Sequence, residues 1–370
     1  MSRGVPVKTP LPRADNPGVM SALPSFPYAG AASALLVVAA AIAGAGWTLR
    51  ALRRRERRRE RRETAELALD LRAFLELRLS APALAAAAEA AEPGAFWSAL
   101  EDLVSRGPGW LRLSRALADC PHVERERRAL RDDSLWRREL AARRLALLFS
   151  PASRRALRDA LEEGPELVTA AAAAALARYR DPAALRWLLA HPEALARRPH
   201  RLRVSLLRAF GRRGLGELAA ALQRGTGDAA MDRALIEALG LAGDGAARRA
   251  VERRLREGDV EQRVAAARAL GRMDAGDCAV SLVAALQDPA WPVRAQAARA
   301  LGELHADIAL LALPARLTDP AWWVRHHAAH ALRELGAEGR RELERIAGGS
   351  PDPYARDMAR DVLDGRCDVA

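Results

Sequence analysis

Asp288-Pro-Ala-Trp-Pro-Val-Arg-Ala-Gln-Ala-Ala-Arg-Ala-Leu-Gly302 returns 31 residues later as Asp319-Pro-Ala-Trp-Trp-Val-Arg-His-His-Ala-Ala-His-Ala-Leu-Arg333. A fixed period of this length is typical of a solenoid, because so small a unit cannot bury its own apolar face and must stack on its neighbours. The same register extends back to Gly271 and Gly240 and forward to Arg356. We therefore expect a row of repeats that presents an extended binding surface.

Each repeat contains two segments with apolar residues at helical spacing, which predicts a helical hairpin. These positions are Leu282, Leu286, Leu313 and Leu317 in the first segments, and Ala297, Ala298, Ala328 and Ala329 in the second. Asp or Ser begins the second helix, and glycines such as Gly211, Gly240 and Gly271 are interpreted as helix ends. Because no segment alternates in the manner of a strand, we predict an all-α protein, an α-solenoid.

An acidic residue in the turn and an arginine six residues later recur with the repeat. The pairs are Asp288 with Arg294, Asp319 with Arg325 and, as a near match, Glu257 with Arg263. This pattern resembles HEAT repeats of the short, phycobilisome-lyase-like type. The resemblance covers Arg203 to Leu363 and implies a ladder of hydrogen bonds between repeats. Upstream of Arg203 we find no such aspartate, and only the helical period supports further HEAT-like hairpins there.

An uncharged segment, residues 29–49, has the length of about 20 residues that a helix needs to cross a bilayer. Tyr28 and Trp47 stand at its ends, where aromatic rings prefer the lipid headgroups. Nine arginines and three glutamates follow between Arg50 and Glu63. Since positively charged flanks stay in the cytoplasm, the sequence predicts one N-terminal transmembrane helix of a bacterial inner membrane, with the N-terminus outside and the solenoid in the cytoplasm.

A cleaved signal peptide is the alternative, because Ala43-Gly-Ala45 has the small residues of a cleavage site. In that case the solenoid would be exported and soluble. With an uncleaved span, the predicted organisation is a short extracytoplasmic tail (1–28), a transmembrane helix (29–49), an arginine-rich segment (50–63), linker helices (64–121) and the repeat solenoid (122–370).

The formal net charge of +12 is concentrated near the predicted membrane surface, since the segment from Arg50 to Glu63 alone contributes +6. Its arginines, Arg53, Arg54 and Arg55 among them, are expected to contact anionic lipid. Aromatic residues make up only 4% of the chain, too few for a platform that stacks bases, so we expect no nucleic-acid partner. The three cysteines are far apart, which is consistent with a reducing compartment.

No catalytic or phosphate-binding motif is present, and we expect neither a cofactor nor a metal. The one local cluster is His326, His327 and His330, at positions expected to face solvent. HEAT-like deoxyhypusine hydroxylases hold iron through His-Glu pairs in several repeats; here His327 replaces the glutamate, so the site would be incomplete. A bilin lyase-like or metal-dependent HEAT-repeat enzyme remains the catalytic alternative.

Three tryptophans lie at the head of the second helices, Trp291, Trp322 and Trp323. They either pack between repeats or, together with Arg294, Arg325 and the three histidines, bind a partner, because Trp and Arg dominate the energetics of interfaces. The sequence as a whole favours a membrane-anchored scaffold without catalytic activity that binds a protein partner at the cytoplasmic face of the membrane. Another membrane protein or an envelope-assembly protein is the candidate partner that the anchor suggests.

Overall fold

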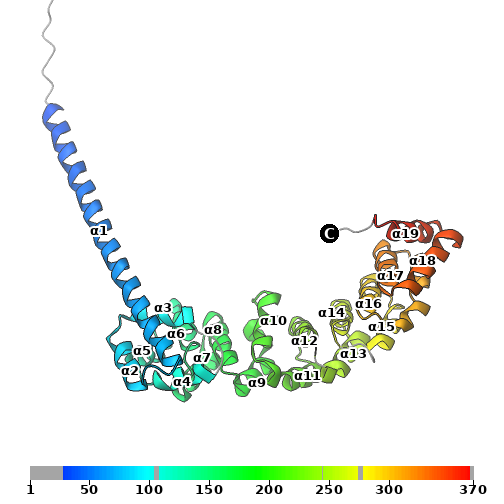
Figure 1. Ribbon diagram of the computed structural model, residues 1–370, viewed down its shortest axis with the longest axis horizontal. Coiled ribbons are helices and arrows are strands. Elements are labelled where there is room, and N and C mark those ends of the chain that lie inside the picture. The colour runs from blue at the N-terminus through cyan, green and yellow to red at the C-terminus, as the bar shows by residue number, and fades with distance from the viewer. Residues whose placement is uncertain (1–27, 104–107, 244, 274–277, 367–370) are drawn as a thin grey trace, which may run out of the picture. The chain divides into compact units, whose positions relative to one another are not determined.

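The structure, a computed structural model, describes residues 28–103, 108–243, 245–273 and 278–366; side chains are described from Trp47 onward, apart from that of Pro108. Every element in these residues is an α-helix or a 3-10 helix, which confirms the all-α prediction (Figure 1). The chain forms two compact units, Met1–Arg62 and Glu63–Ala370.

Helix α1 (Tyr28–Leu75) passes from the first unit into the second. It contains no proline, and its Arg and Glu residues are strong helix formers. Leu67, Leu71 and Phe74 are buried, while Leu77 adopts a left-handed φ of 65° just after the helix ends. The last turns of α1 therefore belong to the core of the second unit.

The second unit begins with short helices whose starts coincide with prolines: α2 (Ala81–Ala90), α3 (Pro93–Leu103), α4 (Pro108–Ala116) and α5 (Pro121–Ala129). Proline suits the first turn because its missing N–H has no partner there in any helix. The rings of Phe96 and Trp97 lie edge to face at 4.8 Å, and both side chains are buried. They anchor this part of the core.

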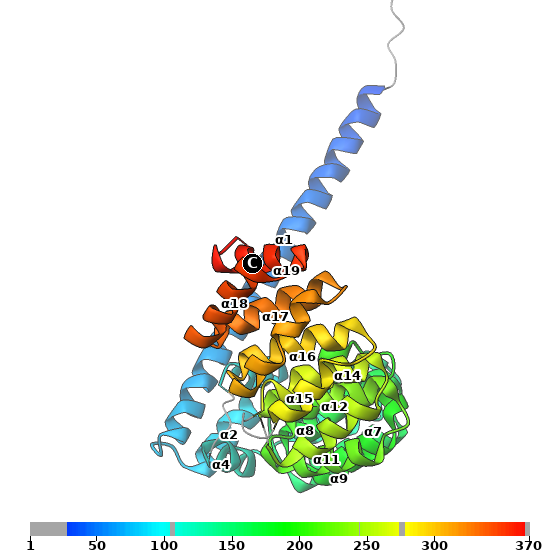
Figure 2. The same ribbon diagram turned by 90° about the vertical axis from the view of Figure 1, so that its right-hand side faces the viewer.

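Helical hairpins follow, and their two rows of helices form two layers (Figures 1 and 2). The first row contains α7 (Pro151–Glu163), α9 (Pro182–Ala190), α11 (Leu215–Arg224), α13 (Arg248–Glu257), α15 (Cys278–Ala285) and α18 (Ala337–Gly349). The second row contains α6 (Leu135–Leu145), α8 (Glu166–Arg178), α10 (His200–Ala209), α12 (Ala229–Ala242), α14 (Val260–Leu270), α16 (Trp291–Glu303), α17 (Trp322–Glu334) and α19 (Pro353–Leu363). Each helix of the second row contacts the next one, so the core is continuous.

One predicted helix is replaced by two 3-10 helices, η4 (Asp307–Leu311) and η5 (Pro314–Thr318). Leu313 and Leu317 are buried as the repeat requires, yet no α-helix carries them. Pro314 lacks the N–H that a continuous α-helix would use, and its ring obstructs the preceding turn. Tight turns thus replace the first helix of the hairpin whose second helix is α17.

The interpretation as a helix end is wrong for Gly240, which lies inside α12, and is confirmed for Gly271, which is the C-cap of α14. The φ of Gly271 is a right-handed −62°, so its place at the helix end does not by itself require glycine. A Cβ atom at Gly240 would lie 2.6 Å from Cβ of Ala269, and one at Gly271 would lie 2.8 Å from Cβ of Ala300. Successive second-row helices approach so closely here that only hydrogen fits. Gly211, with a φ of 71°, does follow a helix end.

Candidate protein-interaction surface

Arginine and aspartate side chains join successive repeats near the start of the second-row helices. Arg263 donates from Nε and Nη2 to Asp288 at 2.7 and 2.9 Å, and Arg294 donates from the same atoms to Asp319 at 2.7 and 2.8 Å. Each arginine also donates from Nη1 to a backbone carbonyl in the turn before its own helix, at 2.9 Å to Gly258 and 2.8 Å to Asp288. We call each such arginine–aspartate pair a rung.

The carboxylates of the rungs are held ionised. Burial alone raises the pKa of Asp319, but hydrogen bonds from Arg294 and from the Ala321 amide outweigh it, so the pKa lies below its ordinary value. Asp288 behaves in the same way with Arg263 and the Ala290 amide. Because donors approach from two sides, each aspartate fixes both its own turn and the neighbouring repeat.

One expectation about the ladder needs correction. Glu257 is not part of it, since its carboxylate pairs with Arg253 at 2.7 Å on the surface. Upstream of Arg203, Arg158 of α7 donates to Asp181 at 3.1 and 2.6 Å, but this pair joins first-row helices across 23 residues and is not a rung. The rungs themselves join second-row helices across 25 residues.

Beside the rungs, aromatic side chains project from the first turns of α16, α17 and α19. Trp291, Trp322 and Trp323 are 46%, 41% and 51% exposed, and Tyr354 is 66% exposed. The indole rings of Trp322 and Trp323 meet edge to face at 4.8 Å. These four residues are called the aromatic edge below. Tyr354 was not among the candidate site residues predicted from the sequence, although the period of 31 places it in register with Trp323.

The three histidines do not share one environment. His326 is only 9% exposed, so the expectation that it faces solvent is wrong. The Trp322 ring stacks on it at 4.8 Å, and its counterpart in the preceding repeat, Ala295, is buried as well. Desolvation, helped by the nearby His326 and Arg299, lowers the pKa of His327 to about 4, so this ring is neutral at pH 7.

No group of three or more His, Cys, Asp or Glu side chains within the described parts of the chain is arranged to hold a metal ion. His326 and His330 lie close, with ring centroids 4.3 Å apart, and Arg333 contacts Nδ1 of His330 at 3.1 Å. His326 thus packs beneath the aromatic edge, whereas His327 and His330 are only partly buried.

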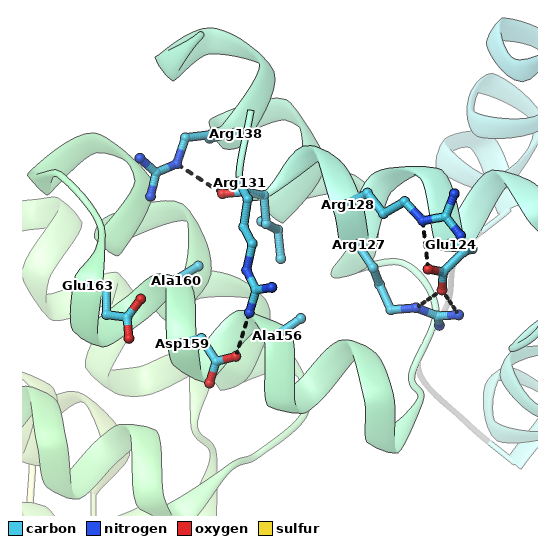
Figure 3. A pocket seen from close by; sticks show the side chains of 10 residues that line it. Glu124, Arg127, Arg128, Arg131, Arg138, Ala156, Asp159, Ala160 and Glu163 are labelled. Carbon is cyan, nitrogen blue, oxygen red and sulfur yellow. Dashed lines mark hydrogen bonds and ion pairs between the residues drawn. The ribbon is translucent and has the colours of Figure 1, made fainter. Parts of the chain in front are cut away.

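A shallow pocket of about 330 Å³ lies between α5, α6 and α7 (Figure 3). Five of its charged side chains pair with one another: Glu124 accepts from Arg127 and Arg128 at 2.8 and 3.1 Å, and Arg131 lies 3.7 Å from Asp159. Arg138 donates to the carbonyl of Leu130. This arrangement stabilises the helix junction and brings together no nucleophile with a base.

Among the described residues we find no helix long and apolar enough to cross a membrane. The predicted span at residues 29–49 falls almost wholly on residues whose side chains lie outside the description, as does the side chain of Tyr28, so the span stays a prediction. Trp47 is 71% exposed, and Arg53, Arg54 and Arg55 are exposed on α1.

Comparison with known proteins supports the class of fold. Residues 279–364 match the sequence profile of HEAT repeats. No curated protein matches the chain. Human deoxyhypusine hydroxylase in complex with glycerol is 21% identical over 74% of this chain and 96% of its own, with a TM-score of 0.31. Kap121p is 14% identical over 72% of this chain and 40% of its own, with a TM-score of 0.36. At such TM-scores neither likeness bears on function.

Proposed function

We propose that this protein is a non-catalytic scaffold that binds a protein partner through the aromatic edge. The observation that carries the proposal is the exposure of Trp291, Trp322 and Trp323, each between 41% and 51%, on the adjoining helices α16 and α17. Large aromatic side chains contribute most to binding when a partner desolvates them. The helical-repeat architecture supports this proposal because it supplies extended surfaces on which partners dock.

Substitution of Trp322 and Trp323 together by alanine should abolish partner binding and leave the protein folded. A photoreactive amino acid placed at Tyr354, which is 66% exposed and belongs to the aromatic edge, would capture the partner in living cells for identification by mass spectrometry. Binding of that partner to the purified full-length variant is then measured directly. Trp136→Ala, which removes another tryptophan with 63% exposure, is the matched control. If the double variant loses its helical circular dichroism, or still binds the partner, the tryptophans are packing residues instead.

We further propose that residues 29–49 anchor the chain in a bacterial inner membrane and that the arginine-rich segment lies against anionic lipid in the cytoplasm. Two features support this: the uncharged run of suitable length, and nine arginines immediately after it. Each arginine near an anionic surface contributes on the order of 1 kcal/mol of attraction.

A C-terminal reporter that is active only in the cytoplasm tests this topology. We expect reporter activity in the membrane fraction on a chain of uncleaved mass. Replacing Arg53, Arg54 and Arg55 by glutamine should lower the fraction of molecules with this orientation, because the positive flank is weakened. An inactive reporter on a shortened soluble product would instead establish the exported alternative.

A further inference from the structure

The first turns of three successive second-row helices each present a pair of apolar residues. The pairs follow one another at the repeat period of 31 residues: Trp291 with Pro292 in α16, Trp322 with Trp323 in α17, and Pro353 with Tyr354 in α19. Pro292 is partly exposed, and the other five are exposed. None of the three turns contains an acidic residue. The aromatic edge is therefore a row of three similar apolar places.

The turns before these pairs are held by the same hydrogen bonds in all three repeats. Nη1 of Arg294, Arg325 and Arg356 donates to the two carbonyls at the start of its own turn, at distances between 2.6 and 3.2 Å. The guanidinium carbon of Arg325 also lies 5.2 Å from the centroid of the Tyr354 ring. Each pair is thus presented by a backbone that is fixed before any partner binds.

The spacing of the pairs selects the backbone of a partner that follows the edge. Helix α16 contacts α17, and α17 contacts α19; packed helices lie about 8–10 Å apart. A polyproline II helix has three residues per turn and presents the same face about every 9 Å. A β-strand does so about every 7 Å, and an α-helix about every 5 Å, or about 11 Å over two turns. The spacing therefore excludes a strand and fits polyproline II or an α-helix.

Hydrogen-bond donors along the edge distinguish these two conformations. Among the described residues, the indole N–H groups of Trp291, Trp322 and Trp323 and the hydroxyl of Tyr354 donate to no protein acceptor, whereas Trp110 donates to a backbone carbonyl at 2.6 Å. An α-helix uses its carbonyls internally, but polyproline II forms no internal hydrogen bonds and leaves its carbonyls free. Only the second conformation offers acceptors along its whole length.

We propose that the aromatic edge binds a proline-rich segment of the partner in the polyproline II conformation. Every third residue of the segment lies against one helix of the edge, and its backbone carbonyls accept from the indole and phenol donors. This inference rests on the proposed function, because it names the kind of partner segment that the edge recognises. A segment already held in one conformation loses little entropy on binding, which favours recognition by aromatic rings.

A phage-displayed library of random linear peptides tests the conformation of the bound segment. The library is selected on the full-length protein in lipid nanodiscs, and peptides that also bind the variant with alanine at Trp322 and Trp323 are removed. We expect the remaining peptides to be rich in proline, with large apolar residues three positions apart. Replacing their prolines by glycine should weaken binding about tenfold or more, because the free peptide then becomes flexible.

Substitution by phenylalanine tests the donors and keeps an aromatic ring at each place. Trp291→Phe, Trp322→Phe and Tyr354→Phe are each expected to weaken peptide binding about fivefold, the scale of one hydrogen bond. Trp136→Phe, at a tryptophan with 63% exposure outside the edge, should bind like the wild type. Circular dichroism checks that each variant is folded.

Three results would overturn the polyproline II segment: no peptide that depends on the tryptophans, remaining peptides without proline or with apolar residues at helical spacing, or undiminished binding to all three phenylalanine variants. The proposed function is decided by a different measurement. It fails only if the partner captured at Tyr354 still binds the variant with alanine at Trp322 and Trp323.

Discussion

Substitution of Asp319 by asparagine is expected to destabilise the solenoid by about 3 kcal/mol, because it leaves a buried guanidinium without its counterion. The side chains of Arg294 and Asp319 are only 12% and 3% exposed. Asparagine retains an acceptor for one hydrogen bond but no charge. We expect amide hydrogen exchange in α16 and α17 to accelerate before exchange elsewhere, since the stability of a repeat depends mainly on its neighbours.

The dependence of the unfolding free energy on pH gives a second test of the Asp319 rung. The pKa of Asp319 is lower in the folded protein than in the unfolded chain, so the rung stabilises the fold fully above the unfolded pKa, about 4. That stabilisation is lost as the pH falls from about 4 through the folded pKa. The wild type should therefore lose more stability than Asp319→Asn over this range.

Asp307→Asn serves as the control, because Asp307 is exposed at the start of η4. It should leave both the exchange rates and the acid response within error of the wild type. Equal acid sensitivity of Asp319→Asn and the wild type would show that the rung is not a stabilising ion pair.

The second large effect is expected at Gly240, where alanine should destabilise the protein by about 2 kcal/mol through overpacking. The added Cβ would lie 2.6 Å from Cβ and 2.7 Å from Cα of Ala269, and the backbone of α14 cannot yield as a flexible side chain would. On propensity alone the same change would favour the helix by up to about 1 kcal/mol. The sign of the measured change in unfolding free energy therefore decides between packing and propensity.

Gly216→Ala is the matched comparison, because Gly216 also lies inside a helix, α11, and an added Cβ meets nothing within 4 Å. We expect this variant to be slightly more stable than the wild type. Both variants are compared by urea unfolding under identical conditions. Stabilisation by Gly240→Ala would contradict the close approach of α12 and α14.

The arginine–aspartate rungs show which side-chain contacts a repeated sequence pattern can predict. The recurrence of Asp288, Arg294, Asp319 and Arg325 is visible in the sequence and predicts a ladder. The resemblance implies hydrogen bonds between repeats, and the rungs confirm them, since each arginine binds the aspartate 25 residues later, which is the period of 31 less the offset of six. The sequence did not show that the same arginine also donates from Nη1 to the turn before its own helix, because that contact depends on the backbone of the folded turn.

The candidate site also has features that the sequence predicted and features that only the structure showed. The period located Trp291, Trp322 and Trp323 but did not show whether their side chains are buried between repeats or exposed. A side chain in the first turn of a helix can point along the helical layer or away from it. His326 was expected on the surface and is buried, since the stacked Trp322 ring covers it. Side chains in contact across one turn of α17 determine each other's exposure, and that requires the folded helix and its neighbours.

The helical class, the repeat period and the stacked hairpin design were accessible from sequence, because helical spacing and small residues recur at fixed separations along the chain. The tertiary structure alone decided that glycine is needed at Gly240 and Gly271 for helix approach, that 3-10 turns precede α17, and that His326 is buried. Each of these depends on atoms from an adjoining repeat or a neighbouring turn. Contacts of that kind are set by packing geometry, which sequence periodicity does not record.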